Sequence, residues 1–243
     1  MKKGTPIPQI ERQRLRLQTE LDAEKSSAER NRLGQFATPT DLAFDIALYA
    51  SEQLPKREPI RFLDPAIGTG AFYSALSRAV PKSRIAEALG FEIDPHYQKP
   101  ATQLWASTGL VIKAGDFTRQ APDARFNVII CNPPYVRHHH IANDEKARIQ
   151  QRTLEASGMK LSGLAGLYCH FLGQSHAWLA PDGIAGWLIP SEFMDVNYGR
   201  AVRQYLLSKV TLLHIHRFDP ADVQFADALV SSAVVWFKKA PRP

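Results

Sequence analysis

The amino-acid sequence predicts an α/β protein with an open, mostly parallel sheet of seven strands and helices on both of its faces. Apolar runs of strand length alternate with amphipathic helical stretches along most of the chain, and this rhythm is typical of strand–helix–strand units. The last two apolar runs, 210–218 and 229–239, have no helical stretch between them. They should therefore pair as antiparallel neighbours at one edge of the sheet.

The expected elements follow one another in a regular order. Strands are expected at IRFL (60–63), RIAEALGFE (84–92), GLVIKA (109–114), FNVIIC (126–131), IAGWLIP (184–190), VTLLHIHRF (210–218) and LVSSAVVWFKK (229–239). Helices are expected at 38–54, after each of the first two strands, at 164–179 and at 200–209. The PDG at 181–183 should end the helix at 164–179, and a polar stretch at 137–163 precedes that helix.

Ahead of these elements, residues 9–32 form a polar segment without internal Gly or Pro. One helix is expected there, solvated and laid on the domain or on a partner; an arm that follows nucleic-acid phosphates is the alternative. The sequence is accordingly divided into an N-terminal polar helical extension, 1–32, and a main domain, 33–243.

The composition favours a polyanionic partner. The 243 residues carry a formal net charge of +6, with a sequence pI near 9.4, and such a balance favours nucleic acid. Cys131 and Cys169 are the two cysteines; they make no disulfide framework and have no metal-ligand spacing. No apolar run approaches bilayer length and no secretory signal opens the chain. We therefore expect a cytoplasmic protein without a bound metal.

The first strand is followed by DPAIGTGAF, a glycine-rich turn. In open parallel sheets, ligands bind beyond the carboxyl ends of the strands. Gly68 and Gly70 allow a tight turn that brings a ligand against a helix amino terminus, and Asp64 can order the turn or hold a ligand amine. Tyr73 replaces the third glycine of the dinucleotide fingerprint, and no phosphate-binding GxxxxGK[ST] occurs.

The next two strands end in carboxylates. Glu92, with Asp94 as the alternative, is placed to accept the hydroxyls of a ribose, although Asp94 also suits a helix cap. Asp116 can accept a hydrogen bond from an adenine amino group, and Phe117 can cover the ring. Together with the glycine turn, these strand ends indicate a nucleoside site.

The fourth strand ends at NPPY, 132–135. An exocyclic amine such as that of adenine is a poor nucleophile, because its lone pair is delocalised into the ring. The side-chain oxygen of Asn132 and the carbonyl of Pro133 can accept its two hydrogens and favour a pyramidal nitrogen. Prolines hold that carbonyl rigidly, and Tyr135 offers a face for a base to stack on.

In this order and spacing, LDPAIGTGAF, GFEID, AGDF and NPPY resemble the class I S-adenosylmethionine-dependent methyltransferases, with their Rossmann-like fold. GQFATPTDLA at 34–43 resembles the cofactor-binding segment that opens the gamma-class, TaqI-type, adenine-specific DNA methyltransferases. The resemblance covers about 33–238 and implies that 33–243 is a catalytic domain. It implies methyl transfer from S-adenosyl-L-methionine to the exocyclic amine of adenine in double-stranded DNA, within a restriction-modification system. The adenine would enter the NPPY pocket by base flipping.

The resemblance also implies a role for each matching residue. Cofactor contacts are expected from Thr38, Pro39, Asp64, Pro65, Ala66, Gly68, Gly70, Glu92, Ile93, Asp116, Phe117 and Asn132. The target adenine would be received by Asn132, Pro133, Pro134 and Tyr135, with Phe225 as a second stacking aromatic or, alternatively, a packing residue. His138, His139 and His140 are expected in a loop beside the substrate, in contact with phosphates rather than a metal.

The extent of the sequence and two other classes of protein bear on the predicted function. TaqI-type enzymes continue into a domain that reads the DNA sequence, whereas this sequence ends at Pro243, shortly after the last strand. We therefore expect either a fragment or a chain that depends on a separate recognition or nuclease subunit. Release-factor glutamine methyltransferases also use NPPY and are a second candidate class. A cofactor-binding but inactive DNA-binding subunit is the third.

Overall fold

The computed structural model describes residues 8–219 and 231–241. A seven-stranded sheet with the order β3-β2-β1-β4-β5-β7-β6 forms its centre. The strands are β1 (Ile60–Asp64), β2 (Ile85–Glu92), β3 (Leu110–Ala114), β4 (Phe126–Cys131), β5 (Leu179–Pro190), β6 (Thr211–Arg217) and β7 (Ser232–Lys238). Strand β7 is antiparallel to both β5 and β6, and the pairs among β1 to β5 are parallel. The predicted sheet and its antiparallel pair are confirmed.

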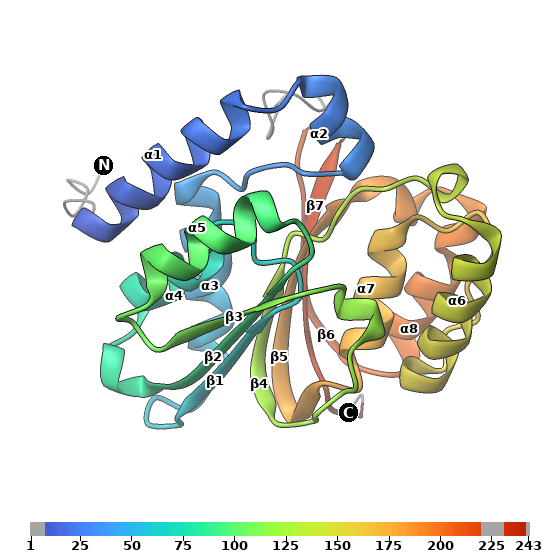
Figure 1. The fold of residues 1–243 in the computed structure, drawn as a ribbon. Helices are drawn as coiled ribbons and strands as arrows, with labels where there is room; N and C mark the ends of the chain where they lie inside the picture. Colours follow the sequence, from blue (N-terminus) through green and yellow to red (C-terminus); the bar gives the residue numbers. More distant parts are fainter. Residues whose placement is uncertain (1–7, 220–230, 242–243) are drawn as a thin grey trace.

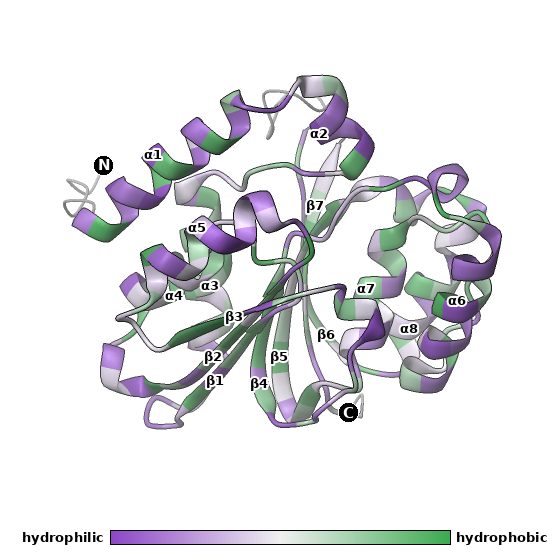
Figure 2. Cartoon of the chain, in the orientation of Figure 1, coloured by the Kyte–Doolittle hydropathy of each residue, from purple (hydrophilic) through white to green (hydrophobic). Residues whose placement is uncertain are grey.

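Helices cover both faces of the sheet (Figure 1). They are α1 (Gln9–Ala23), α2 (Ser27–Leu33), α3 (Thr40–Glu52), α4 (Ala71–Ala79), α5 (Pro95–Trp105), α6 (Asn143–Ser157), α7 (Leu167–Ser175) and α8 (Arg200–Ser208). Successive strand residues point to opposite faces: Phe62 packs in the core shared with α3, α4 and α5, whereas Leu63 packs in the core shared with α7 and α8. Hydrophobic residues are concentrated in the central strands (Figure 2).

Two expected helices, and the turn expected to end the second of them, differ from the structure. The segment 9–32 is two helices, because Ser26 caps α2 by accepting the Glu29 N–H at 3.2 Å and Arg30 donates to backbone carbonyls at the break. Helix α7 is shorter than 164–179 because Gly166 is its N-cap and β5 begins at Leu179. PDG lies within β5, where Asp182 has a φ of 60° and the register with β4 shifts.

Helix α6 lies in the polar stretch where the sequence patterns predicted no element. Its buried residues are Ile149, Thr153 and Ser157, so its core-facing stripe contains one large apolar side chain. A stripe this polar gives almost no hydrophobic periodicity. The stripe is stabilised by hydrogen bonds instead, since Thr153 Oγ1 lies 2.9 Å from His170 Nδ1 of α7.

His170 should make the stability of the fold depend on pH. It is 2% exposed, and burial lowers its pKa to about 4 from the ordinary 6.5. The unfolded chain therefore binds a proton more readily, and stability falls as the pH drops from 6.5 towards 4. We expect a loss of about 2–3 kcal/mol between pH 7.5 and 4.5, measured by urea unfolding. His170→Gln should remove this part of the dependence, whereas His214→Gln, at an exposed position, should retain it.

Candidate active site

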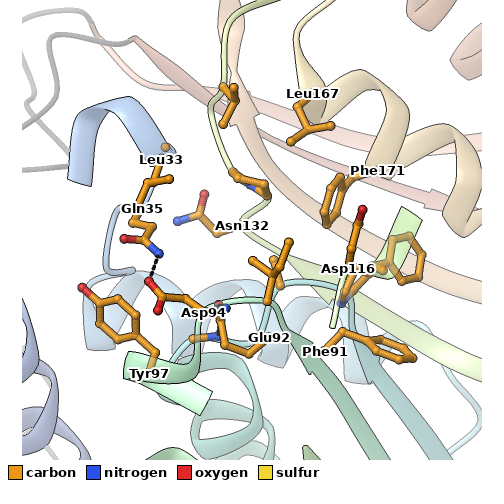
Figure 3. A pocket seen from close by; sticks show the side chains of 18 of the residues that line it. Leu33, Gln35, Phe91, Glu92, Asp94, Tyr97, Asp116, Asn132, Leu167 and Phe171 are labelled. Carbon is orange, nitrogen blue, oxygen red and sulfur yellow. Dashed lines mark hydrogen bonds between the residues drawn. The ribbon is translucent and has the colours of Figure 1, made fainter. Parts of the chain in front are cut away.

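A cavity of about 840 Å³ lies beyond the carboxyl ends of four parallel strands. Residues that directly follow the strands line it: Pro65 after β1, Ile93 after β2, Gly115 after β3 and Asn132 after β4. The close-up in Figure 3 shows side chains from these turns converging with those of α2 and α7. The volume suits a small-molecule ligand, since such sites typically measure about 300–1,000 Å³.

The glycine turn forms one wall of this cavity. Pro65, Ala66 and Gly68 line it, whereas Gly70 is the N-cap of α4 with a φ of 92°. A Cβ at Gly70 would lie 2.5 Å from Trp105 Nε1, and the same indole N–H donates to Thr69 O at 2.8 Å. Glycine is therefore required at this position by both conformation and space.

Asp64 lies beneath this turn and does not line the cavity. It is 1% exposed, and its Oδ1 accepts the Ala66 N–H at 3.1 Å. Burial raises the pKa of Asp64 to about 8, with a smaller contribution from nearby Glu92. In the structure, Asp64 therefore orders the glycine turn and does not face the cavity.

Glu92 ends β2 and lines the cavity. Its Oε2 accepts the Gly68 N–H at 3.0 Å and its Oε1 accepts the Asp94 N–H at 2.9 Å. Burial raises the pKa of Glu92 above its ordinary value. Ile93 follows with 67% of its side chain exposed, and it also lines the cavity. Asp94 caps α5 by accepting the His96 N–H at 3.0 Å, so the cap that the sequence allowed is confirmed.

The turn after β3 provides the opposite wall. Asp116 and Phe117 both line the cavity. Asp116 Oδ1 accepts the Thr118 N–H at 2.8 Å. Phe117 is 2% exposed because its ring lies in an aromatic cluster, with centroids 5.4 Å from Phe171 and 5.5 Å from Trp178. Only a small part of the Phe117 ring can therefore contact a ligand.

The side-chain nitrogen of Asn132 is hydrogen-bonded, whereas its side-chain oxygen is not. Its Nδ2 donates to the Phe36 carbonyl at 2.9 Å and to Thr38 Oγ1 at 3.2 Å. A carbonyl only accepts, so these contacts fix which end of the amide is the nitrogen. Asn132 Oδ1 is buried and has no hydrogen-bond partner within the described protein. A buried acceptor without a partner is unfavourable unless a ligand supplies a donor.

The rest of NPPY is held in place by the segment that follows α2 and by β5. Tyr135 N donates to Gly34 O at 3.3 Å, and Tyr135 Oη donates to Leu188 O at 3.1 Å. Gly34 has a φ of 65°, and a Cβ there would lie 2.3 Å from Tyr135 N. Pro134 lines the cavity, whereas Pro133 is buried.

Besides Asp64, Gly70 and Pro133, three more predicted site residues do not line the cavity, and one is not described. Thr38 reaches the site through Asn132, Pro39 is the N-cap position of α3, and Tyr135 packs 5.6 Å from the Phe36 ring between centroids. Phe225 lies outside the described residues. His140 of the histidine turn lines the cavity.

The structure adds two walls that the sequence interpretation missed. From α6, Glu145 and Ile149 line the cavity, and Arg148 clamps the neighbouring turn by donating to Thr118 O at 2.7 Å. The second wall comes from α1, α2 and the turn between them: Gln18, Asp22, Lys25, Glu29 and Leu33 line the cavity. The signal for the second wall is a polar stripe at spacings of three and four, formed by residues 11, 14, 18 and 22, which places these side chains on one helix face.

Solved structures define the class of fold. The chain superposes on a class I S-adenosylmethionine-dependent methyltransferase from Listeria monocytogenes with a TM-score of 0.75 and 18% identity, over 95% of this chain and 68% of that one. It matches a type I restriction-modification methyltransferase subunit from Streptococcus thermophilus with a TM-score of 0.70 and 16% identity, over 84% and 45% of the two chains. The fold is that of the class I S-adenosylmethionine-dependent methyltransferases.

Sequence relatives define the family. Residues 84–224 match the Eco57I restriction-modification methylase family, and the chain belongs to it. The type II methyltransferase M.XamI of Xanthomonas campestris pv. amaranthicola is 30% identical over 213 residues, covering 85% of this chain and 39% of the relative. M.AccI of Acinetobacter calcoaceticus is 30% identical over 207 residues, covering 85% and 37%. The chain thus spans about two fifths of the length of these curated relatives.

The fold and the family imply S-adenosyl-L-methionine as cofactor, and the residues of the cavity fit it. Ile93 presents a largely exposed apolar side chain to the cavity, as an adenine ring requires. Each Glu92 oxygen accepts one backbone N–H and retains a second lone pair for a ribose hydroxyl. Within the described ranges, no helix is long and apolar enough to cross a membrane.

Proposed function

We propose that this chain carries the catalytic domain of a gamma-class, adenine-specific DNA methyltransferase of a restriction-modification system. The observation that carries the proposal is the unpartnered, buried Oδ1 of Asn132. Asn132 lines the cavity together with the predicted ribose acid Glu92 and adenine acceptor Asp116. An acceptor held free in this way suits a donor amine brought by the substrate.

Asn132 and Pro133 would prepare that amine for reaction. Asn132 Oδ1 accepts one amine hydrogen and the Pro133 carbonyl accepts the other, so that the nitrogen becomes pyramidal and its lone pair points outward. Because the Asn132 amide is fixed by Phe36 and Thr38, the acceptor is oriented before the substrate arrives. When bound, the cofactor supplies an electrophilic methyl group. The amine proton can leave to water after transfer.

The adenine would reach these acceptors by base flipping. An exocyclic amine inside a duplex is inaccessible, and extrusion of the nucleotide costs a few kcal/mol. Tyr135 would offset part of this cost by stacking, a contribution of about 1–3 kcal/mol for aromatic–base contacts. Its hydroxyl is anchored to Leu188 O, which fixes the position of the ring. Phe225 is proposed as the second aromatic.

Cofactor binding is proposed to use the three strand ends and the glycine turn. Glu92 would bind the ribose hydroxyls, Ile93 would pack on the adenine ring and Asp116 would accept its amino group. Pro65, Ala66 and Gly68 would border the methionine part, and Thr38 would act through Asn132. Because the chain spans about two fifths of the length of its curated relatives, we propose that a further domain or subunit reads the DNA sequence.

The test is the chemical identity of the methylated product. The purified chain is incubated with double-stranded DNA and cofactor carrying a tritiated methyl group, and the DNA is digested to nucleosides and analysed by mass spectrometry. N6-methyladenine is the expected product. Exclusive N4-methylcytosine would overturn the adenine assignment, and methylation of a glutamine-bearing release factor in place of DNA would overturn the whole proposal.

A further inference from the structure

Helices α1 and α2 and the turn between them, here called the N-terminal arm (residues 9–33), lie beyond the carboxyl ends of the parallel strands (Figure 1). Five residues of the arm line the cavity: Gln18, Asp22, Lys25, Glu29 and Leu33. The arm is bonded to the domain at two places. At its start, Arg14 Nη1 donates to Thr69 Oγ1 of the glycine turn at 3.2 Å, and Glu11 accepts Thr40 Oγ1–H at 2.9 Å. Both Glu11 and Arg14 are 1% exposed, so this end is part of the interior.

The end of α1 and the turn after it are bonded to the amino end of α5. Lys25 pairs with Asp94, and Lys25 Nζ also donates to Gln35 Oε1 at 3.1 Å. Gln35 Nε2 in turn donates to Asp94 Oδ2 at 2.9 Å (Figure 3). Tyr97 Oη donates to Asp22 Oδ1 at 2.8 Å. We call Lys25, Gln35 and Asp94 the latch.

The latch is partly buried and electrostatically matched. The Lys25 and Asp94 side chains are 12% and 17% exposed. Burial by itself would raise the pKa of Asp94, but hydrogen bonds from Lys25 and Gln35 outweigh it and hold that pKa below its ordinary value. Lys25 is the sole Lys or Arg among the described residues that line the cavity. Lys25 is thus the charged partner of the Asp94 carboxylate, beside the neutral donors Gln35 Nε2 and the His96 N–H.

The latch connects directly to the predicted ribose acid. Asp94 N donates to Glu92 Oε1 at 2.9 Å, and Ile93 lies between the two acids with its side chain in the cavity. The contacts run from Lys25 through Asp94 to Glu92. A change at Lys25 can thus move the turn that would hold the ribose and the adenine ring, although Lys25 belongs to a different part of the chain.

We propose that Lys25 and Gln35 are positioning residues for the cofactor, which makes the N-terminal arm part of the S-adenosylmethionine site. They act by fixing the turn of Glu92, Ile93 and Asp94 in its binding geometry. The inference rests on the cofactor-binding part of the proposed function and is independent of the substrate that receives the methyl group.

The test is a double-mutant cycle on cofactor affinity, measured by calorimetry with S-adenosylmethionine and no DNA. Lys25→Met and Asp94→Asn should each weaken binding about tenfold, the usual effect of removing a hydrogen bond to a charged group. Asn keeps the oxygen that caps α5. The double variant should bind no more weakly than either single variant, because both remove the same pair. Lys25→Arg should restore affinity to within about threefold of the starting chain.

Lys99→Met is the matched control. Lys99 is exposed on α5, the helix that Asp94 caps, so this substitution should leave cofactor affinity unchanged. Affinity of Lys25→Met within twofold of the starting chain, or additive losses in the double variant, overturns the inference. Thermal melting without cofactor separates a folding defect from a positioning role. If Lys25→Met does not fold, Gln35→Met tests the same latch: weakened binding supports the inference and unchanged binding overturns it. Failure of the unsubstituted chain to bind cofactor would instead overturn the proposed function.

Discussion

Asn132→Ala is expected to lower the rate of methyl transfer by about a thousandfold, while cofactor affinity changes by no more than a few-fold. The variant removes the free acceptor that would hold the amine, and loss of one preorganised group of this kind typically lowers kcat by about 10²–10³. Cofactor affinity should persist because Glu92, Ile93 and Asp116 still line the cavity.

Single-turnover rates with saturating DNA, together with calorimetry for the cofactor, measure the two quantities separately. Asn127→Ala is the matched control, since Asn127 lies near the opposite end of β4 and binds the Arg61 N–H and Pro59 O. That control should lower stability and leave the rate of methyl transfer intact. Equal losses of rate and of cofactor affinity in Asn132→Ala would show that Asn132 acts through structure alone.

The sheet could be predicted from the sequence because parallel strands in a covered sheet are buried on both faces. Strand β4, Phe126–Cys131, is buried at every position and appears in the sequence as an unbroken apolar run. The candidate site could be predicted for the same reason. A buried apolar run that is followed by a polar residue such as Glu92 or Asn132 must reach the edge of the core at that residue. The structure places both residues at one cavity, and their roles remain proposals.

Polar contacts between distant residues could not be predicted in this way. Helix α6 buries Thr153 and Ser157, shows almost no helical period in hydrophobicity and was not predicted. A helix was predicted where α1 lies, but the burial of its Glu11 and Arg14 was not. The pairing of such side chains depends on partners that are distant in sequence, such as Thr69 and Ser74. A pattern search over neighbouring residues therefore leaves the two covering walls of the cavity unassigned.

The buried pair that anchors the N-terminal arm should dominate its contribution to stability. Glu11→Ala is expected to lower the free energy of unfolding by about 3–5 kcal/mol, because it leaves the guanidinium of Arg14 buried without a counter-charge. Arg14 donates to Glu11 from both Nε, at 2.7 Å, and Nη2, at 2.6 Å, and Ser74 donates to the same carboxylate. Urea unfolding monitored by tryptophan fluorescence measures the loss.

The double variant Glu11→Leu with Arg14→Met separates the charge from the docking of the helix. Replacing both members of a buried pair by apolar side chains of similar size is often neutral or stabilising, so this variant should recover most of the stability that Glu11→Ala loses. Glu20→Ala, at an exposed position of the same helix, should change the free energy of unfolding by no more than about 0.5 kcal/mol. If Glu11→Ala were as mild as Glu20→Ala, α1 would not be docked on Thr69 and Ser74 in solution. The arm would then have no fixed place over the cavity, and the latch at Lys25 would have no support at its other end.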